Sequence, residues 1–308
     1  MKNISPNPVS SRAREGFSLI GAQAGFSLIE MMIAIVIGLL ITIVVGNVFL
    51  GSKDTFRTQD DASRLAENAR YAMSVMNRTI RNTGFAYWQN GIQWKAAWSG
   101  KLTAQMAGVN NNTPSLGNSD SITVAYFGSS VLPGTTGDAD GNTLDCLGRK
   151  FKDNTAVEPS TSRFYVANGA DGRPALWCSV NTPGAQTYNS AAAVAVDSKE
   201  LVAGVTTFQV LYGIDTDGDY SPNVFKAANL MSAADMDKVV AVRIGLILAS
   251  PNANTTAETD TKTYQVFGPE YAAFASADPG TSYTPPSSDN KRLRKLYTYT
   301  IAVRGRVQ

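Results

Sequence analysis

The stretch of sequence that decides the fold is residues 25–50, which read GFSLIE followed by MMIAIVIGLLITIVVGNVFL. Residues 26–51 carry a single charged side chain, Glu30. Twenty helical residues rise about 30 Å, which is the thickness of the hydrocarbon core of a bilayer. The pattern therefore predicts a transmembrane helix over residues 31–50. No second run of this kind follows, so we expect the chain to cross a membrane once.

The residues before this stretch are basic. Residues 1–25 contain Lys2, Arg12 and Arg14 against one acidic residue, Glu15. The positive-inside rule then predicts a cytoplasmic N-terminus, and places the chain after residue 51 outside the cytoplasm. A signal anchor or a cleaved secretory signal would share this arrangement. Residues 46–49, however, read GNVF and lack a good small-residue cleavage site.

Glu30 is the feature that neither of these alternatives explains. A carboxylate in an apolar span costs roughly 2.5–3.5 kcal/mol near the bilayer centre and less toward its edge, and such residues usually have a partner. No basic residue of the same helix follows within reach of Glu30. The carboxylate is therefore expected to find its partner elsewhere.

The sequence Gly25-Phe26-Ser27-Leu28-Ile29-Glu30, with the apolar run behind it, resembles the class III signal of type IV prepilins. The resemblance implies that residues 1–25 are a leader peptide, which prepilin peptidase removes by cutting between Gly25 and Phe26. It also implies N-methylation of Phe26, and a role for Glu30 in filament assembly. In that role the carboxylate neutralises the new α-amine of a neighbouring subunit, which offsets the desolvation of both charges.

A second copy of the same letters lies nine residues earlier, at Gly16-Phe17-Ser18-Leu19-Ile20. Its next residue is Gly21, where Glu30 stands in the later copy, and no unbroken apolar run follows. We therefore predict cleavage at Gly25 and not at Gly16.

A long helix is predicted over residues 26–83. Beyond the apolar run, hydrophobic residues recur at three- and four-residue steps. They are Phe56, Ala62, Leu65, Ala66, Ala69, Ala72, Met73, Met76 and Ile80. Charged residues occupy most of the complementary face, namely Arg57, Asp60, Asp61, Arg64, Glu67 and Arg78. Thr83-Gly84 is the expected end, and Gly46 and Gly51 are expected weak points.

Composition excludes most enzyme classes. The chain has 308 residues, 27 Lys and Arg against 25 Asp and Glu, two Cys and no His. The absence of His removes the usual proton shuttle and the Ser-His-Asp and Cys-His arrangements. Two cysteines alone cannot build a zinc or iron–sulfur site. We therefore expect a protein that is not an enzyme, and the small net charge argues against a general nucleic-acid binder.

Residues 84–308 are predicted to form a β-rich head, so the fold class is α+β. The expected strands are residues 121–127, 163–167, 175–180, 205–212, 239–248, 263–267 and 296–304. In the longest of these, one buried face is predicted to consist of Val240, Val242, Ile244, Leu246 and Leu248, with Arg243 on the opposite face.

Cys146 and Cys178 lie outside the cytoplasm in this topology, where oxidation is expected. They lack the close C-x-x-C spacing of a redox pair. A structural disulfide is predicted, worth roughly 3–4 kcal/mol in the chain-entropy model for a loop of this length.

Two acidic loops suggest calcium. They are Asp138-Ala139-Asp140-Gly141-Asn142 and Asp215-Thr216-Asp217-Gly218-Asp219. Oxygen ligands at alternate positions suit Ca²⁺, and Asp215, Asp217 and Asp219 are the better candidates. Against an EF-hand, the sixth position is Thr143 or Tyr220 where Gly is needed, and the twelfth is Arg149 or Lys226. Asp-Gly is also an ordinary turn signal, so a site without any cofactor remains the alternative.

Two surface features have a functional and a structural interpretation. The aromatic group Phe85, Tyr87, Trp88, Trp94 and Trp98 could bind sugar, but packing of the head against the helix is the commoner reason for such a group. The C-terminal basic residues could touch DNA or anionic lipid, but solvated charges on a final β-strand are the preferred interpretation. These residues are Lys291, Arg292, Arg294, Lys295, Arg304 and Arg306.

The head resembles the PilW type of minor pilin in three places. They are residues 81–85 (RNTGF), residues 212–219 (YGIDTDGD) ahead of 239–244 (VVAVRI), and residues 295–304 (KLYTYTIAVR). Major pilins are usually shorter than this chain. The resemblance implies a low-abundance subunit of a tip complex that primes pilus assembly, with other minor pilins, the major pilin and a tip adhesin as partners.

Two other functions stay open. One is a type II secretion pseudopilin of the J-like class, which has the same kind of N-terminal signal and apolar helix. The other is a tip subunit that itself contacts DNA or a host surface. For a pilus subunit, the resemblance implies an inner-membrane protein with a periplasmic head before assembly and a place at the pilus tip afterwards.

Overall fold

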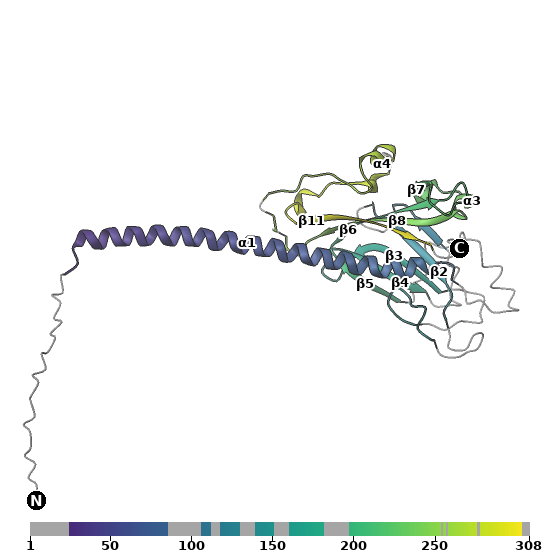
Figure 1. Cartoon of the computed structure of the whole chain (residues 1–308), viewed down its shortest axis with the longest axis horizontal. Coiled ribbons are helices and arrows are strands. Elements are labelled where there is room, and N and C mark those ends of the chain that lie inside the picture. The colour runs from purple at the N-terminus through teal and green to yellow at the C-terminus, as the bar shows by residue number, and fades with distance from the viewer. Residues whose placement is uncertain are drawn as a thin grey trace, which may run out of the picture. The chain divides into compact units, whose positions relative to one another are not determined.

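The computed structural model describes residues 25–85, 106–111, 118–129, 139–150, 160–181, 197–253, 255–256, 258–275 and 278–303. The chain divides into two compact units, Met1–Lys53 and Asp54–Gln308. Its main elements are one long helix, α1, and strands that belong to three antiparallel sheets of the second unit (Figure 1). The expected α+β class, a long helix packed on a β-rich head, is confirmed.

Helix α1 spans Leu28–Arg81, close to the predicted 26–83. The helix continues without interruption through Gly46 and Gly51. The expectation that it is weak at these two glycines is therefore wrong if it is taken to mean a break in the helix. The end of the helix follows the prediction. Thr83 donates its hydroxyl to the Ile80 carbonyl at 2.6 Å, and Gly84 adopts the left-handed φ of 73°.

The first sheet has the order β1-β2-β3-β4-β5. Its strands are β1 (Met106–Val109), β2 (Ser121–Tyr126), β3 (Ser160–Asn168), β4 (Pro174–Asn181) and β5 (Asp197–Ala203). The end of α1 joins this sheet directly, because the Gly84 N–H donates to the Ala125 carbonyl at 2.9 Å.

The second sheet has the order β11-β8-β6-β7. Its strands are β6 (Val205–Ile214), β7 (Val224–Lys226), β8 (Val239–Ala249) and β11 (Arg294–Ala302). Two short strands, β9 (Tyr264–Gln265) and β10 (Ser282–Tyr283), form a third sheet. Short helices occupy the connections: η3 (Ala228–Leu230), α3 (Ala233–Met236), α4 (Pro269–Phe274), η4 (Pro279–Thr281) and η5 (Ser287–Asp289).

Gly204 connects the first two sheets. Its N–H donates to the Pro174 carbonyl at the start of β4, and its carbonyl accepts from the Ala249 N–H at the end of β8. Its φ is +81°, and a Cβ at this position would lie 2.5 Å from the Ala249 carbonyl oxygen. The chain can therefore pass from β5 to β6 here only through a residue without a side chain.

The core lies between α1 and these two sheets. The helix contributes a stripe of buried apolar residues, Leu65, Ala69, Ala72, Val75, Met76 and Ile80. Every residue of β6 is buried, and so is every residue of β8 except Arg243. The prediction that Phe56 belongs to this stripe is wrong, because Phe56 is 73% exposed.

Strand β8 differs from its prediction in its second face. The expected face from Val240 to Leu248 is buried, but so are Ala241 and Ile247 on the other side. A Cβ on Gly245 would lie 2.1 Å from the Val266 side chain, which shows that the segment around β9 covers that face. A central strand covered on both sides loses the simple alternation that the sequence suggested.

Candidate functional site

The first predicted site lies at the start of α1. Gly25, Phe26 and Ser27 precede the helix, and the Phe26 side chain is 88% exposed. The Ser27 N–H donates to a carboxylate oxygen of Glu30 at 3.4 Å, and the Met31 N–H donates to the Ser27 carbonyl at 3.1 Å. Glu30 therefore lies in the first helical turn, where the helix dipole favours a negative charge. The bond between Gly25 and Phe26 lies in exposed, non-helical backbone.

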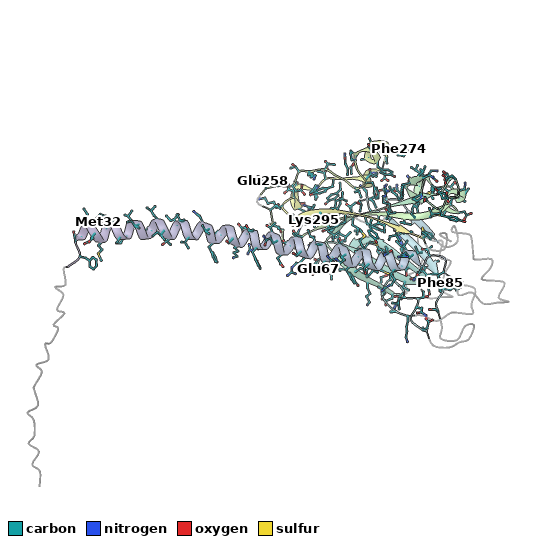
Figure 2. The ribbon with its side chains drawn as sticks, viewed as in Figure 1. Met32, Glu67, Phe85, Glu258, Phe274 and Lys295 are labelled. Carbon is teal, nitrogen blue, oxygen red and sulfur yellow. A yellow bond between two sulfur atoms is a disulfide. The ribbon has the colours of Figure 1, made fainter. Side chains whose placement is uncertain are left out.

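The surface behind Glu30 is apolar and uncovered. Every residue from Gly25 to Arg57 is exposed, including the whole run up to Leu50. Among the described residues, α1 is the helix that is long and apolar enough to cross a membrane. Figure 2 shows the side chains around Met32 standing free on all sides of the helix. An apolar surface of this size requires lipid or other apolar helices around it.

A second polar site, missed from the sequence, ties α1 to the head. Asp61 is fully buried, although the sequence placed it on the charged face. Asn252 donates its side-chain amide to both carboxylate oxygens of Asp61, at 2.9 and 3.1 Å. Thr255 donates its hydroxyl to the same carboxylate at 2.6 Å. A buried carboxylate needs such partners, and here three hydrogen bonds supply them.

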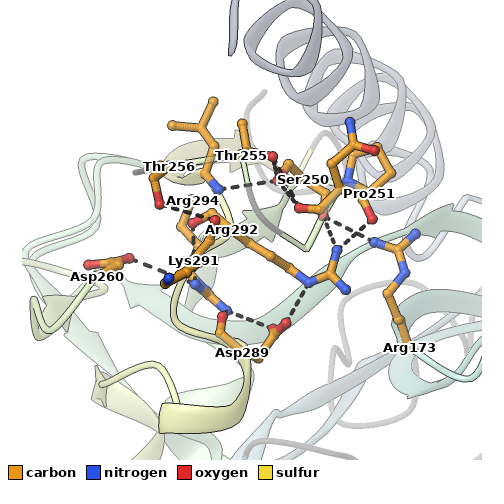
Figure 3. Close-up of polar contacts among 12 residues, drawn as sticks. Arg173, Ser250, Pro251, Thr255, Thr256, Asp260, Asp289, Lys291, Arg292 and Arg294 are labelled. Carbon is orange, nitrogen blue, oxygen red and sulfur yellow. Dashed lines mark hydrogen bonds and ion pairs between the residues drawn. The ribbon is translucent and has the colours of Figure 1, made fainter. Parts of the chain in front are cut away.

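The loop that holds Asp61 is itself fixed by arginines (Figure 3). Arg292 donates to the carbonyl of Ser250 at 2.8 Å and to that of Pro251. Arg173 donates to the Ser250 carbonyl at 3.2 Å. Asp289 pairs with Arg292 and, at 2.7 Å, with Arg294. Charged hydrogen bonds of this kind are roughly twice as strong as neutral ones, so the network orders the loop firmly.

This network corrects the interpretation of the C-terminal basic residues. Lys291 and Lys295 are exposed, as expected for solvated charges. Arg294, however, has a fully buried side chain, and that of Arg292 is only 12% exposed. Both face the interior because their partners are acidic residues and carbonyls of the head. Arg304 and Arg306 lie outside the described residues.

Asp120 is a second buried acid. It is 3% exposed and accepts the Asn111 N–H at 2.9 Å and the Val210 N–H at 2.8 Å. It thereby connects the turn after β1 to β6. Burial raises the pKa of Asp120 to about 7, and the nearby Asp278 carboxylate acts in the same direction.

Cys146 and Cys178 form the expected disulfide. Both side chains are buried, and their Cα atoms are 6.3 Å apart. The bond attaches the loop around Asp145 to β4. The Arg78 side chain of α1 donates to the carbonyl of Asp145 at 3.3 Å, so the same loop also contacts the helix. These contacts are consistent with a structural role.

The acidic loop at 215–219 brings its three carboxylates together. Ligand oxygens of Asp215, Asp217 and Asp219 all lie within 4.8 Å of one another. Asp215 accepts the Gly218 N–H at 2.6 Å and the Tyr220 N–H at 2.9 Å. Burial acts to raise the pKa of Asp215, but these backbone N–H groups outweigh it and the pKa is lowered. Tyr220 adopts a φ of 64°, so it takes the left-handed conformation for which the sequence lacked a Gly.

The other predicted features are less complete. Asp140 of the earlier loop bonds to Ser129 and to Asn142, while Asp138 lies outside the described residues. Within the described residues only the 215–219 loop gathers three acidic ligands. Of the aromatic group, Phe85 is 38% exposed. Tyr87, Trp88, Trp94 and Trp98 lie outside the described residues.

Comparisons with known proteins find matches to the N-terminal segment and to the C-terminal half of the chain. Residues 163–305 match the family model of Type IV Pilus-assembly protein W, and residues 20–46 match the prokaryotic N-terminal methylation motif. Among solved structures, the chain is similar to a type IV-like pilin from Thermus thermophilus, with 14% identity and a TM-score of 0.45 over 80% of this chain and 98% of that one. No curated protein matches the sequence significantly. The methylation motif at the start of α1 and the family match over β3 to β11 support a type IV pilin-like protein of the PilW type.

Proposed function

We propose that the chain is a minor pilin, a subunit of the tip complex that primes assembly of a type IV pilus. Prepilin peptidase would remove residues 1–25 and leave Phe26 as the methylated N-terminus. The protein would then be held in the inner membrane by α1, with its head in the periplasm, until it enters the pilus tip. Its partners would be the major pilin, other minor pilins and a tip adhesin.

The observation that carries this proposal is the exposed apolar start of α1 with one carboxylate in its first turn. In a membrane the hydrophobic effect does not select between helices, so charge and packing choose the neighbour. Glu30 is the only charge from Phe26 to Gly51. After cleavage, the Phe26 amine of a second subunit would be its natural counter-ion. This role is structural and requires no catalytic group.

The cleavage site can be tested by N-terminal sequencing of the mature chain. We expect methylated Phe26 as the first residue. The methylation-motif match begins at residue 20 and so covers Gly25 but not Gly16, which supports this choice. Gly25→Val should block processing, whereas the matched variant Gly16→Val should be processed normally. A mature chain that begins at Phe17 would refute the assignment.

Assembly can be tested with Glu30→Val, with Glu30→Asp as the control that keeps the charge. Glu30→Val should insert into the membrane as well as the wild type, because it makes the span more apolar. It should fail to co-purify with the other pilins, while Glu30→Asp should retain part of that association. Normal surface pili containing the Glu30→Val protein would exclude the proposed role of this carboxylate.

Crosslinking in the native envelope distinguishes a pilus from a secretion pseudopilus. We expect crosslinks from the exported protein to pilus subunits. Crosslinks to secretion components alone would favour the J-like pseudopilin. Direct contact of the head with DNA has less support, because Arg292 and Arg294 are occupied inside the protein.

A further inference from the structure

Strand β11 is an edge of the second sheet. It pairs with β8 over its whole length, from Arg294 opposite Ala249 to Ala302 opposite Ala241, without a shift in register. Among the residues that the structure describes, no strand pairs with its other side. From Thr298 to Thr300 the side chains are exposed.

The register shows which backbone groups of β11 are free. The Val303 N–H donates to the Val240 carbonyl, and the Ser250 N–H donates to the Leu293 carbonyl, so the odd-numbered residues are the ones bonded to β8. In an antiparallel pair the residues alternate between bonded and non-bonded positions. The N–H and C=O groups of Leu296, Thr298 and Thr300 therefore point away from β8.

Beyond its first two residues, Arg294 and Lys295, this edge lacks the usual protection against pairing. Natural edge strands are blocked by short length, Pro, bulges or inward charges. β11 has nine residues, no Pro and no bulge, and Lys295 is its only exposed charge. Its sequence alternates Tyr and Thr, which favour extended backbone. Such an edge is a template for one more strand.

Charge selects the kind of strand that fits. From Lys291 to Arg306 the sequence contains six basic residues and no acidic one. Lys295 lies near one end of β11, and Arg304 and Arg306 follow its other end in the sequence. A second copy of β11 paired in parallel would place Lys295 beside its own counterpart, so such self-pairing is disfavoured. An incoming strand with acidic residues at its ends would complement the exposed Lys291 and Lys295.

We propose that the free edge of β11 binds an extended, acid-flanked segment of a partner protein as an additional strand of the second sheet. The main-chain groups of Leu296, Thr298 and Thr300 would provide the hydrogen bonds. Side chains of the added strand that point to the outer face would meet a groove of about 570 Å³, lined by Leu296, Thr298, Thr300 and residues 265–268. The inference deepens the proposed assembly function by naming the chemistry of one partner contact.

The probe is a nine-residue peptide in which five alternating threonines and valines are flanked by two aspartates on each side. We expect it to bind the full mature chain in detergent, and to slow hydrogen exchange of the Thr298 and Thr300 amides at least tenfold. The same peptide flanked by lysines should bind at least tenfold more weakly. Unchanged exchange at both amides with saturating aspartate-flanked peptide would overturn the proposal.

A variant pair tests the edge itself. Thr298→Pro removes an N–H that points away from β8, so it should leave the melting temperature close to that of the wild type and abolish peptide binding. Thr298→Val keeps the N–H and should bind as well as the wild type. A folded Thr298→Pro protein that still binds would contradict the proposal. If that variant does not fold, the exchange measurement on the wild type decides.

The peptide-binding experiment can fail or succeed independently of the assembly experiment that tests the proposed function. Peptide binding uses the head alone, so Glu30→Val should bind the peptide normally even where it fails to assemble. Absence of peptide binding together with normal assembly would overturn only this inference.

Discussion

The Thr255 hydroxyl donates to the Asp61 carboxylate at 2.6 Å, across 194 residues of sequence. Asp61 lies one turn before Leu65, the first apolar residue of the buried stripe of α1. The loop that carries Thr255 is in turn fixed by Arg173 and Arg292. This contact therefore sets the point at which the helix first enters the core of the head.

We predict that Asp61→Ala lowers the free energy of unfolding by about 1–3 kcal/mol, because it leaves buried donors on Asn252 and Thr255 without their acceptor. Chemical denaturation followed by circular dichroism measures this. Asp60→Ala is the matched control. It removes only an exposed ion pair with Arg64 at 2.9 Å, so it should cost less than about 1 kcal/mol. Equal effects of the two variants would contradict the importance of the buried contact.

Asp120 should make the stability of the head depend on pH. In the folded protein burial raises its pKa to about 7, whereas in the unfolded chain it titrates near 3.9. Between these values the folded state holds more protons than the unfolded state. The contribution of Asp120 is therefore complete below about pH 4, and it is lost as the pH rises through about 7, by at most about 4 kcal/mol.

The titratable groups around Asp120 are Asp278, Tyr212 and Tyr271. Asp120→Asn should be less stable at low pH and should lose most of the decline between pH 4 and 7. Asp278→Asn should shift that decline to lower pH, because it removes a like charge. Urea titrations at half-unit steps of pH give the slopes. A wild-type slope that persists in Asp120→Asn would assign it to other groups.

The sequence predicted the elements whose burial can be inferred from their own apolar residues. Helix α1 and the central strands β6 and β8 follow from periodicity, since their burial arises mainly from hydrophobic side chains. Strand β5 was missed because it begins with Asp197 and Ser198 and forms a polar sheet edge. Its pairing depends on β4, which no local pattern reveals.

The candidate sites divide in the same way. Glu30 stands out because it interrupts an apolar run. Asp61 was assigned to the charged face because its neighbours Asp60 and Arg64 are exposed. Its spacing of four residues before Leu65 does place it in line with the buried stripe, and this was the available signal. The partners that make its burial tolerable come from residues 252–255, so tertiary structure decides the outcome.

Gly204 should be sensitive to any side chain. Gly204→Ala combines a left-handed φ of +81° with a contact of 2.5 Å between its Cβ and the Ala249 carbonyl oxygen. Gly172→Ala is a close control, because its φ is +75° and nothing lies within 4 Å of its Cβ. The backbone conformation alone should cost about 1–2 kcal/mol in the control. Overpacking should add about 1–3 kcal/mol in Gly204→Ala, and similar melting temperatures for the two variants would contradict this.

Calcium binding at the 215–219 loop stays a hypothesis that calorimetry can test. Asp215, Asp217 and Asp219 offer oxygens at alternate positions, and the left-handed Tyr220 gives the backbone the turn that such a loop needs. Lys226 at the twelfth position pairs with Asp235 at 3.1 Å, so the bidentate ligand of an EF-hand is missing. We therefore expect weak binding, with a Kd of about 10⁻⁴–10⁻³ M as in extracellular calcium modules.

Asp217→Asn should weaken calcium binding at least tenfold while the fold is retained, since Asp215 and not Asp217 accepts the backbone N–H groups of Gly218 and Tyr220. Asp140→Asn, in the other acidic loop, should leave it unchanged. Millimolar Ca²⁺ that produces no heat with the wild type would show that the three carboxylates form only a turn.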